Sequence, residues 1–326
     1  MICNTLPSLF TAALILSTLV STPAVAQDAA STLVRLTERS QSIVQAKVLR
    51  VETAGTAKRV LFRVQRTLRG TQVGSFLLAE PAGRACGRAL HGVITSGSYL
   101  IFLAESSNGG RPATARLTIA SSRAVIHVDP DTLAHVGALV GARSARERST
   151  LLTIALTSRN QRIRRDAALA LPIRAGLETA SVADHDRVVA ALQNALLADD
   201  HVALGLIRTA TRLRLRAATP MLLRTYLSGK ASSLTQVMRE AIVDLDGAFA
   251  VQQIERSFPS DTKTQARAIE LLERCPGPAP RAALVRLSGS PQQAVAVLAE
   301  QSLDRRDAQT THLFRNIRPQ RRSTGR

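Results

Sequence analysis

Two short runs of acidic residues and histidine have the residue types of a metal site. They are Asp184–Asp186 and Asp199–His201, each with two aspartates and one histidine. Neighbouring residues of a helix point in different directions, so neither run brings three ligands to one ion. Acidic side chains are favoured where helices begin, because the helix dipole is positive there. We therefore expect both runs to be solvated or to cap helices, and we expect no metal.

Residues for nucleophilic or cofactor chemistry do not form a recognisable site. The sequence has no H-E-x-x-H, C-x-x-C, G-x-S-x-G, Walker or G-x-G-x-x-G motif. Cys275 follows an expected helix, whose dipole raises the pKa of a thiol at that end, and Cys86 has no activating neighbour. The two thiols are either free or, in an oxidising compartment, paired with each other. The sequence therefore predicts a non-enzymatic protein with no catalytic residue and no cofactor.

Arginine is the charged residue most able to bind a partner here. The formal net charge is +19. Arg208, Arg212 and Arg216 recur every four residues, which predicts one basic helix face. A second candidate group for binding a partner or an anion consists of Arg315, Arg318, Arg321 and Arg322. Codon bias is the alternative explanation of the arginine excess. The sequence has no Trp and only 3% aromatic residues, so specific nucleic-acid binding by base stacking is not expected.

The first residues predict export. Residues 9–20 are almost entirely apolar but too short to cross a bilayer, and Ala24–Ala26 has the A-x-A pattern of a cleavage site. We expect residues 1–26 to be a signal peptide cut before Gln27, with an uncleaved anchor as the alternative. Cleavage would leave no transmembrane segment and a periplasmic or secreted protein.

The elements that must position these residues change type near residue 129. Before it, apolar residues alternate with period two, which predicts short strands and a hairpin across residues 54–56. The expected strands cover residues 44–48, 60–64, 73–78, 99–103, 116–119 and 124–128. We expect residues 27–130 to form one domain, a small β-barrel or a β-sandwich.

After residue 130 the apolar spacing becomes helical. Ser144 and Glu147 form a capping box, and Gly229 is a suitable helix end. Five helices share a pattern with alanine at one place: Ala167, Ala203, Ala241, Ala268 and Ala296. This spacing predicts a degenerate α-solenoid of helix pairs over residues 131–303. Residues 304–326 are expected to be a disordered or loosely docked arginine-rich tail. The fold class expected is therefore multidomain α and β, a barrel followed by a solenoid.

Short motifs add a resemblance to known families. "SQSIVQAKVLRVE" (40–52), "VLFRVQRTLRG" (60–70), "ACGRAL" (85–90) and "GSYLIFL" (97–103) resemble bacterial secreted netrin-like domains, which share the OB-fold of tissue inhibitors of metalloproteinases. This resemblance implies an OB-like β-barrel for residues 27–130. Inhibition in that family uses a mature N-terminal cysteine, whereas the mature chain expected here starts with Gln27. The helical part resembles HEAT-type repeats, which implies protein–protein interaction.

Two functional hypotheses follow. The first is an exported, non-enzymatic scaffold whose helical surface binds a protein partner in the cell envelope or medium. The second is an electrostatic binder of anionic envelope polymers, glycolipid or phospholipid surfaces through its arginine-rich faces and tail.

Overall fold

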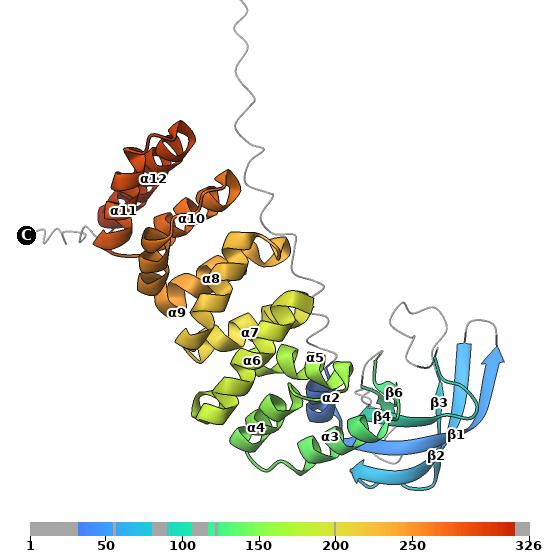
Figure 1. The fold of residues 1–326 in the computed structure, drawn as a ribbon. Coiled ribbons are helices and arrows are strands. Elements are labelled where there is room, and N and C mark those ends of the chain that lie inside the picture. The colour runs from blue at the N-terminus through green and yellow to red at the C-terminus, as the bar shows by residue number, and fades with distance from the viewer. Residues whose placement is uncertain are drawn as a thin grey trace, which may run out of the picture. The chain divides into compact units, whose positions relative to one another are not determined.

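The computed structural model describes residues 32–54, 57–79, 90, 92–105, 117–120, 123–198 and 200–316. The predicted signal peptide and Cys86 lie outside these ranges. The chain divides into two compact units, Met1–Ile173 and Arg174–Arg326. Among the described residues, the first unit contains an antiparallel sheet and four α-helices, and the second contains only helices (Figure 1). The mixed α and β class is as predicted, while the domain boundary expected near residue 130 stays a prediction.

The sheet of the first unit is antiparallel throughout. Its strands are β1 (Ser42–Ala54), β2 (Ala57–Arg69), β3 (Ser75–Ala79), β4 (Ser98–Glu105), β5 (Leu117–Ile119) and β6 (Val125–His127). The order is β3-β2-β1-β4-β5, and β6 also pairs with β4. The six predicted strands are therefore confirmed, as is the β1–β2 hairpin. The expected barrel is not: within the described residues no ladder joins β3 to β5, so the sheet is open.

Alternation along the strands builds the core on one side of the sheet. Val44, Ala46 and Val48 of β1 are buried, and Val60 and Phe62 of β2 lie beside them. Phe62 stacks on Phe76 and meets the ring of Tyr99 edge-on. The complete set of buried residues in this cluster is Val44, Ala46, Val48, Val60, Phe62, Leu78, Leu90, Val93, Tyr99, Ile101 and Leu103.

A short helix that the sequence analysis did not anticipate precedes the sheet. This helix, α2 (Leu33–Arg39), starts at Thr32, whose hydroxyl accepts a hydrogen bond from the backbone N–H of Arg35. It contacts β4 as well as helices α3 (Pro130–Gly141) and α5 (Gln161–Ala170). Its residue Leu36 is only 1% exposed. Helix α2 therefore joins the sheet to the helices of the first unit.

Asp166 of α5 fixes the start of α2. Its carboxylate accepts a hydrogen bond from the backbone N–H of Leu33 at 3.1 Å, and the Nε of Arg162 lies 3.9 Å away. Burial raises the pKa of Asp166 to about 6, although the Leu33 hydrogen bond and nearby arginines act in the opposite direction. The folded chain thus holds a proton on Asp166 in a pH range where the unfolded chain has released it.

This shift predicts a pH-dependent stability with a definite sign. Between the ordinary aspartate pKa and about 6, the free energy of unfolding falls as pH rises, by at most about 3 kcal/mol. Asp166→Asn cannot ionise but can still accept the Leu33 hydrogen bond. It should be more stable than wild type above pH 6 and lose this part of the pH dependence. Urea unfolding at pH 4.5 and 7.5 measures both effects, and an unchanged pH slope in the variant would contradict the assignment.

The remaining helices begin and end largely at the signals in the sequence. They are α4 (Ala145–Ala155), α6 (Val182–Ala198), α7 (Asp200–Arg212), α8 (Thr219–Ser228), α9 (Thr235–Arg256), α10 (Thr262–Arg274), α11 (Pro278–Ser288) and α12 (Gln293–Asn316), with 3-10 turns η1 (Leu171–Ile173), η2 (Leu177–Thr179), η3 (Arg216–Ala218) and η4 (Ser232–Leu234). The Oγ of Ser144 accepts from the N–H of Glu147 at 3.0 Å, as predicted. Gly229 ends α8 in the left-handed conformation, with φ of 66°.

Helices of the second unit pack largely on their neighbours in the chain. Helix α6 packs on α7, α8 on α9, and α11 on α12, while α7 also contacts α9 and α10 contacts α12 (Figure 1). Helix α9 is broken at Asp246, whose Oδ1 caps the second half by accepting from the N–H of Phe249. The small residue Gly247 follows, where an added Cβ would lie 3.4 Å from the Sγ of Cys275.

Four of the five aligned alanines are buried, and the repeat inferred from them stays a prediction. Ala167, Ala203, Ala241 and Ala268 are buried, as small residues at a helix contact should be. The fifth, Ala296, is only half-buried. The residues of α12 that are buried near it are Val295 and Ala299.

The tail predicted from residue 304 is wrong in its first part. Helix α12 continues to Asn316, and Arg305 and Arg306 contact α10. Arg305 binds the carboxylate of Glu273 at 2.7 Å. Although burial raises the pKa of the Glu273 carboxyl, hydrogen bonds from Arg305 and Ser302 outweigh it, so the pKa is lowered overall. Side-chain contacts between α12 and α10 hold the additional turns of α12 after residue 304, and the charge pattern of the sequence does not reveal such contacts.

Candidate functional site

Asp184 acts as a cap. It lies in the first turn of α6, and its carboxylate accepts from the backbone N–H and the hydroxyl of Ser181 at 3.0 and 2.8 Å. The Ser181 hydroxyl in turn accepts from the N–H of Asp184, which completes a reciprocal capping box. Arg187 pairs with the same carboxylate at 2.9 Å. The capping role expected for this run is confirmed for Asp184. The side chains of residues 199–201 lie outside the described residues.

No cluster of side chains in the described part of the chain has the geometry of a metal site. Among those residues, no three His, Cys, Asp or Glu side chains converge closely enough to hold an ion. Nor does any helix there have the length and apolar composition needed to cross a membrane.

Cys275 is poorly suited to nucleophilic chemistry. The side chain is 1% exposed, and burial raises the pKa of its thiol to about 11, against a smaller opposing effect of Arg306. A thiolate is therefore scarce at neutral pH. The sequence analysis expected the same direction, but attributed it to the helix dipole.

The three arginines predicted to share a helix face do not do so. Helix α7 ends at Arg212, and Arg216 begins the 3-10 turn η3. The backbone between them turns away from the helix axis. Arg208 and Arg212 remain on α7, one turn apart, so the predicted face is limited to two residues.

A hydrogen-bonded turn ends α7. The N–H of Leu215 donates a hydrogen bond to the carbonyl oxygen of Ala210 at 2.9 Å. The N–H of Arg214 donates one to the carbonyl oxygen of Thr211 at 3.0 Å. This pair of bonds is the Schellman motif. Leu215, at the position after the cap, is buried, which fixes the turn against the helices. The sequence alone does not indicate this turn, because arginine stands at the position where glycine usually marks it.

Arg214 occupies the position of this motif that glycine usually fills. Its φ is 53°, and among the described residues other than glycine no second positive φ occurs. A side chain in this left-handed region is disfavoured because its Cβ crowds the neighbouring carbonyl. A strained residue that is also charged and exposed is a feature found at binding sites.

The turn gathers positive charge at the surface. We define the arginine turn as Arg208, Arg212, Arg214 and Arg216, all of which are exposed. Arg212 pairs with Glu178 of η2. Hydrogen bonds from the Glu178 backbone and from Arg212 lower the pKa of that carboxyl. The negative end of the α7 dipole favours cations here, but no ion pair to a described residue compensates Arg208, Arg214 or Arg216.

The strain at Arg214 gives a stability prediction. Arg214→Gly should raise the free energy of unfolding by about 0.5–1 kcal/mol, because relief of the left-handed strain exceeds the entropy cost of a new glycine. Arg216→Gly is the matched control, since it removes the same charge at a position without a positive φ, and it should lower stability. Thermal unfolding of both variants tests this. Equal destabilisation by both would mean that the Arg214 backbone is not strained.

No protein-family model matches this chain, and a search of curated proteins likewise finds no significant match. The site must therefore be interpreted from its own chemistry.

Ion pairs and hydrogen bonds tie consecutive helices of the second unit together. Arg239 of α9 pairs with Glu270 of α10, and Arg286 of α11 pairs with Glu255 of α9. The hydroxyl of Tyr226, on α8, donates to the Glu270 carboxylate at 3.1 Å. Burial and the charge of Glu270 raise the pKa of Tyr226. Tyr226 is buried, and these contacts hold α8, α9, α10 and α11 together.

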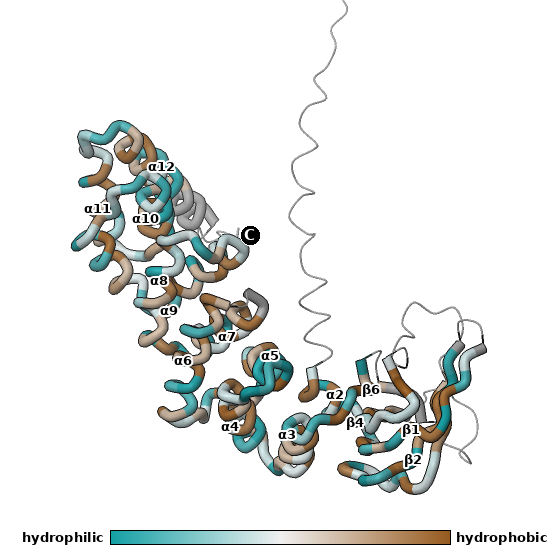
Figure 2. Tube along the Cα trace, turned by 45° about the vertical axis from the view of Figure 1, so that its right-hand side comes forward, coloured by the Kyte–Doolittle hydropathy of each residue, from teal (hydrophilic) through white to brown (hydrophobic). Residues whose placement is uncertain are grey.

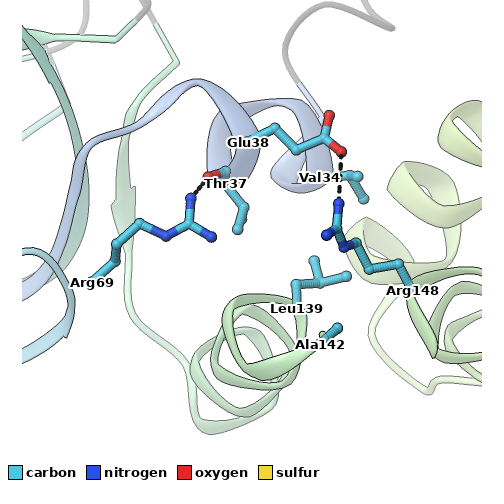
Figure 3. A pocket seen from close by; sticks show the side chains of 7 residues that line it. All are labelled: Val34, Thr37, Glu38, Arg69, Leu139, Ala142 and Arg148. Carbon is cyan, nitrogen blue, oxygen red and sulfur yellow. Dashed lines mark hydrogen bonds and ion pairs between the residues drawn. The ribbon is translucent and has the colours of Figure 1, made fainter. Parts of the chain in front are cut away.

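A hollow in the first unit is the second candidate (Figure 3). It has a volume of about 290 Å³ and lies among α2, α3, α4 and the end of β2. The guanidinium of Arg69 points to the end of α2 and donates to the carbonyls of Thr37 and Ser40. Arg148 pairs with Glu38 at 3.8 Å. Both arginines therefore have structural partners, which leaves the arginine turn as the stronger site.

The described residues do not show where the side chains of the other four predicted arginines lie relative to the arginine turn. Arg315 belongs to α12 by its backbone, and its side chain lies outside the described residues. Arg318, Arg321 and Arg322 also lie outside them.

Proposed function

We propose that this chain is an exported, non-enzymatic binding protein, periplasmic or secreted, whose helical surface binds a protein partner in the cell envelope or medium. The observation that carries the proposal is the arginine turn. It presents Arg208, Arg214 and Arg216 around a turn that backbone hydrogen bonds and the buried Leu215 hold in place. A preorganised surface loses little conformational entropy on binding.

The fold assignment is part of the proposal. We regard the helices as a degenerate α-solenoid of HEAT type, supported by the packing of α6 on α7, α8 on α9 and α11 on α12. We regard the sheet as a netrin-like, OB-type domain in an open form. The β1–β2 hairpin and the pairing of β4 with β1 support this second assignment.

A pull-down from cell-envelope extract tests the function, with washes at low and then high salt. The test variant replaces Arg208, Arg214 and Arg216 with Glu. Its matched control replaces three other exposed cations of the same unit, Lys230, Arg256 and Lys263. We expect wild type and control to retain one discrete protein at high salt, and the test variant to lose it. Equal retention by both variants would exclude the arginine turn as the binding surface.

An electrostatic binder of anionic glycolipid or phospholipid is the second candidate function. It is favoured by the absence of any ion pair from Arg208 and Arg216 to a described residue. Its test is truncation after Asn316, because Arg305 and Arg306 contact α10 and cannot be removed without disturbing the fold. Release of the truncated chain from membranes by moderate salt would favour this function. Unchanged retention of the truncated chain on membranes would exclude the tail as the segment that binds them.

A further inference from the structure

The β1–β2–β3 part of the sheet exposes a face that combines leucine with positive charge. We define the outer sheet face as Lys47, Leu49, Arg59, Leu61, Arg63 and Leu77. These residues lie on the side opposite the buried core, since Val48, Phe62 and Leu78 point inward between them. Figure 2 shows polar and apolar residues mixed along this hairpin. Helix α2 contacts β4, and helix α3 contacts β2.

The leucines lie at the centre of this face. Leu61 on β2 is directly opposite Leu77 on β3 in the ladder. A bulge between Val48 and Arg50 leaves Leu49 without a ladder partner. Leu49 is 47% exposed and Leu77 57% exposed. Leu61, between them, is half-buried. Exposed leucines are ordinary singly, but two exposed leucines next to a third on adjoining strands form an apolar patch that water does not favour.

The cations surround this patch. Arg59 and Arg63 flank Leu61 along β2, each two residues away on the same face. Lys47 lies directly opposite Arg63 in the ladder. Like charges at directly opposed positions destabilise a sheet. The nearest carboxylate on the hairpin, Glu52, lies directly opposite Arg59 in the ladder and pairs with Arg50 at 2.9 Å, which leaves the Lys47–Arg63 pair without a carboxylate opposite it. An external anion would offset this repulsion.

We propose that the outer sheet face docks on a bilayer surface containing anionic phospholipid. A phospholipid surface offers phosphates at the level of the cations and acyl chains just beneath, where the leucine tips would lie. Guanidinium groups bind phosphate in a bidentate manner. A second copy of this chain fits poorly, because its cations would face these. An acidic protein would satisfy the cations but leave the leucines against polar groups.

Vesicle sedimentation tests this proposal with the chain lacking residues 1–26, so that the apolar run at residues 9–20 cannot insert. The vesicles are phosphatidylcholine alone or mixed with phosphatidylglycerol. One variant carries Lys47→Ala and Arg63→Ala, and a second carries Leu49→Ser and Leu77→Ser. The control carries Lys230→Ala and Lys263→Ala, two exposed cations of the second unit. All these side chains are exposed, and circular dichroism verifies that each variant is folded.

We expect wild type and control to bind only the anionic vesicles. The charge variant should bind about 25-fold more weakly, at about fivefold for each cation removed. The leucine variant should bind about tenfold more weakly. Wild-type affinity in either variant overturns the proposal. So does binding of polyglutamate through these residues without binding of vesicles, because the partner would then be an acidic protein.

Discussion

Replacing Arg306 with alanine is expected to lower the free energy of unfolding of the second unit by about 3 kcal/mol. The Arg306 guanidinium reaches from α12 to the end of α10, where it donates to the carbonyls of Leu272, Glu273 and Cys275 at 2.6–3.2 Å. It also donates to Gly277 at 2.8 Å. These carbonyls include some that a helix end leaves without an intrahelical partner. The positive charge also complements the negative end of the α10 dipole.

Arg281→Ala is the matched control for this prediction. Arg281 also contacts α12, through Asp307 at 3.1 Å, but both side chains are 54% exposed. Solvent screens an exposed pair of this kind, so its loss should change stability little. Similar losses in the two variants would show that Arg306 does not cap α10.

The thiol of Cys275 provides a local readout for this comparison. In a Cys86→Ser chain lacking residues 1–26, Cys275 is the single cysteine left in the sequence. Its buried side chain reacts with a thiol reagent only when the surrounding helices open. A loss of about 3 kcal/mol corresponds to a reaction about 100-fold faster in the Arg306→Ala chain. The Arg281→Ala chain should react at nearly the wild-type rate.

Leu36→Ala in helix α2 is expected to destabilise the first unit by about 2–5 kcal/mol. The Leu36 side chain is buried in a helix that contacts β4, α3 and α5 together. Its truncation leaves a cavity at the point where the sheet meets the helices. Hydrogen exchange of the backbone amides of residues 100–103 in β4 should accelerate, while exchange in α8 and α10 should stay unchanged.

Arg39→Ala is the control on the same helix, because Arg39 is exposed and its loss should change stability by less than about 0.5 kcal/mol. If Leu36→Ala accelerated exchange equally in both units, the two units would not unfold independently. If it changed neither, α2 would not be part of the core.

Elements with a strong period could be predicted from the sequence. The alternation of Val44, Ala46 and Val48 identifies β1 because one face of a sheet is buried, and the caps at Ser144 and Gly229 mark helix ends through local hydrogen bonds. Helix α2 escaped prediction because seven residues make two turns, too few to display a period. The docking of Arg305 and Arg306 depends on residues about 30 positions away, which no local pattern reveals.

The candidate site was predicted in residue type but not in geometry. Arg208, Arg212 and Arg216 are exposed cations, as expected, yet the helix that was to align them ends at Arg212. A left-handed cap normally signals itself through glycine, and here an arginine holds the position. Arg214, the residue that most distinguishes the turn, was therefore overlooked. The cationic outer sheet face was overlooked for a different reason, because its residues come from separate strands that only the register brings together.

Site-specific photo-cross-linking tests the central claim most directly. A benzophenone side chain replaces Arg216 in one chain and Lys263, an exposed cation distant from the turn in sequence, in another. Each chain is mixed with cell-envelope extract and irradiated at low and at high salt. A helical surface with a protein partner at the arginine turn predicts one discrete adduct from position 216 at both salt concentrations and none from position 263. The same adducts from both positions, or no protein adduct from position 216, would contradict it.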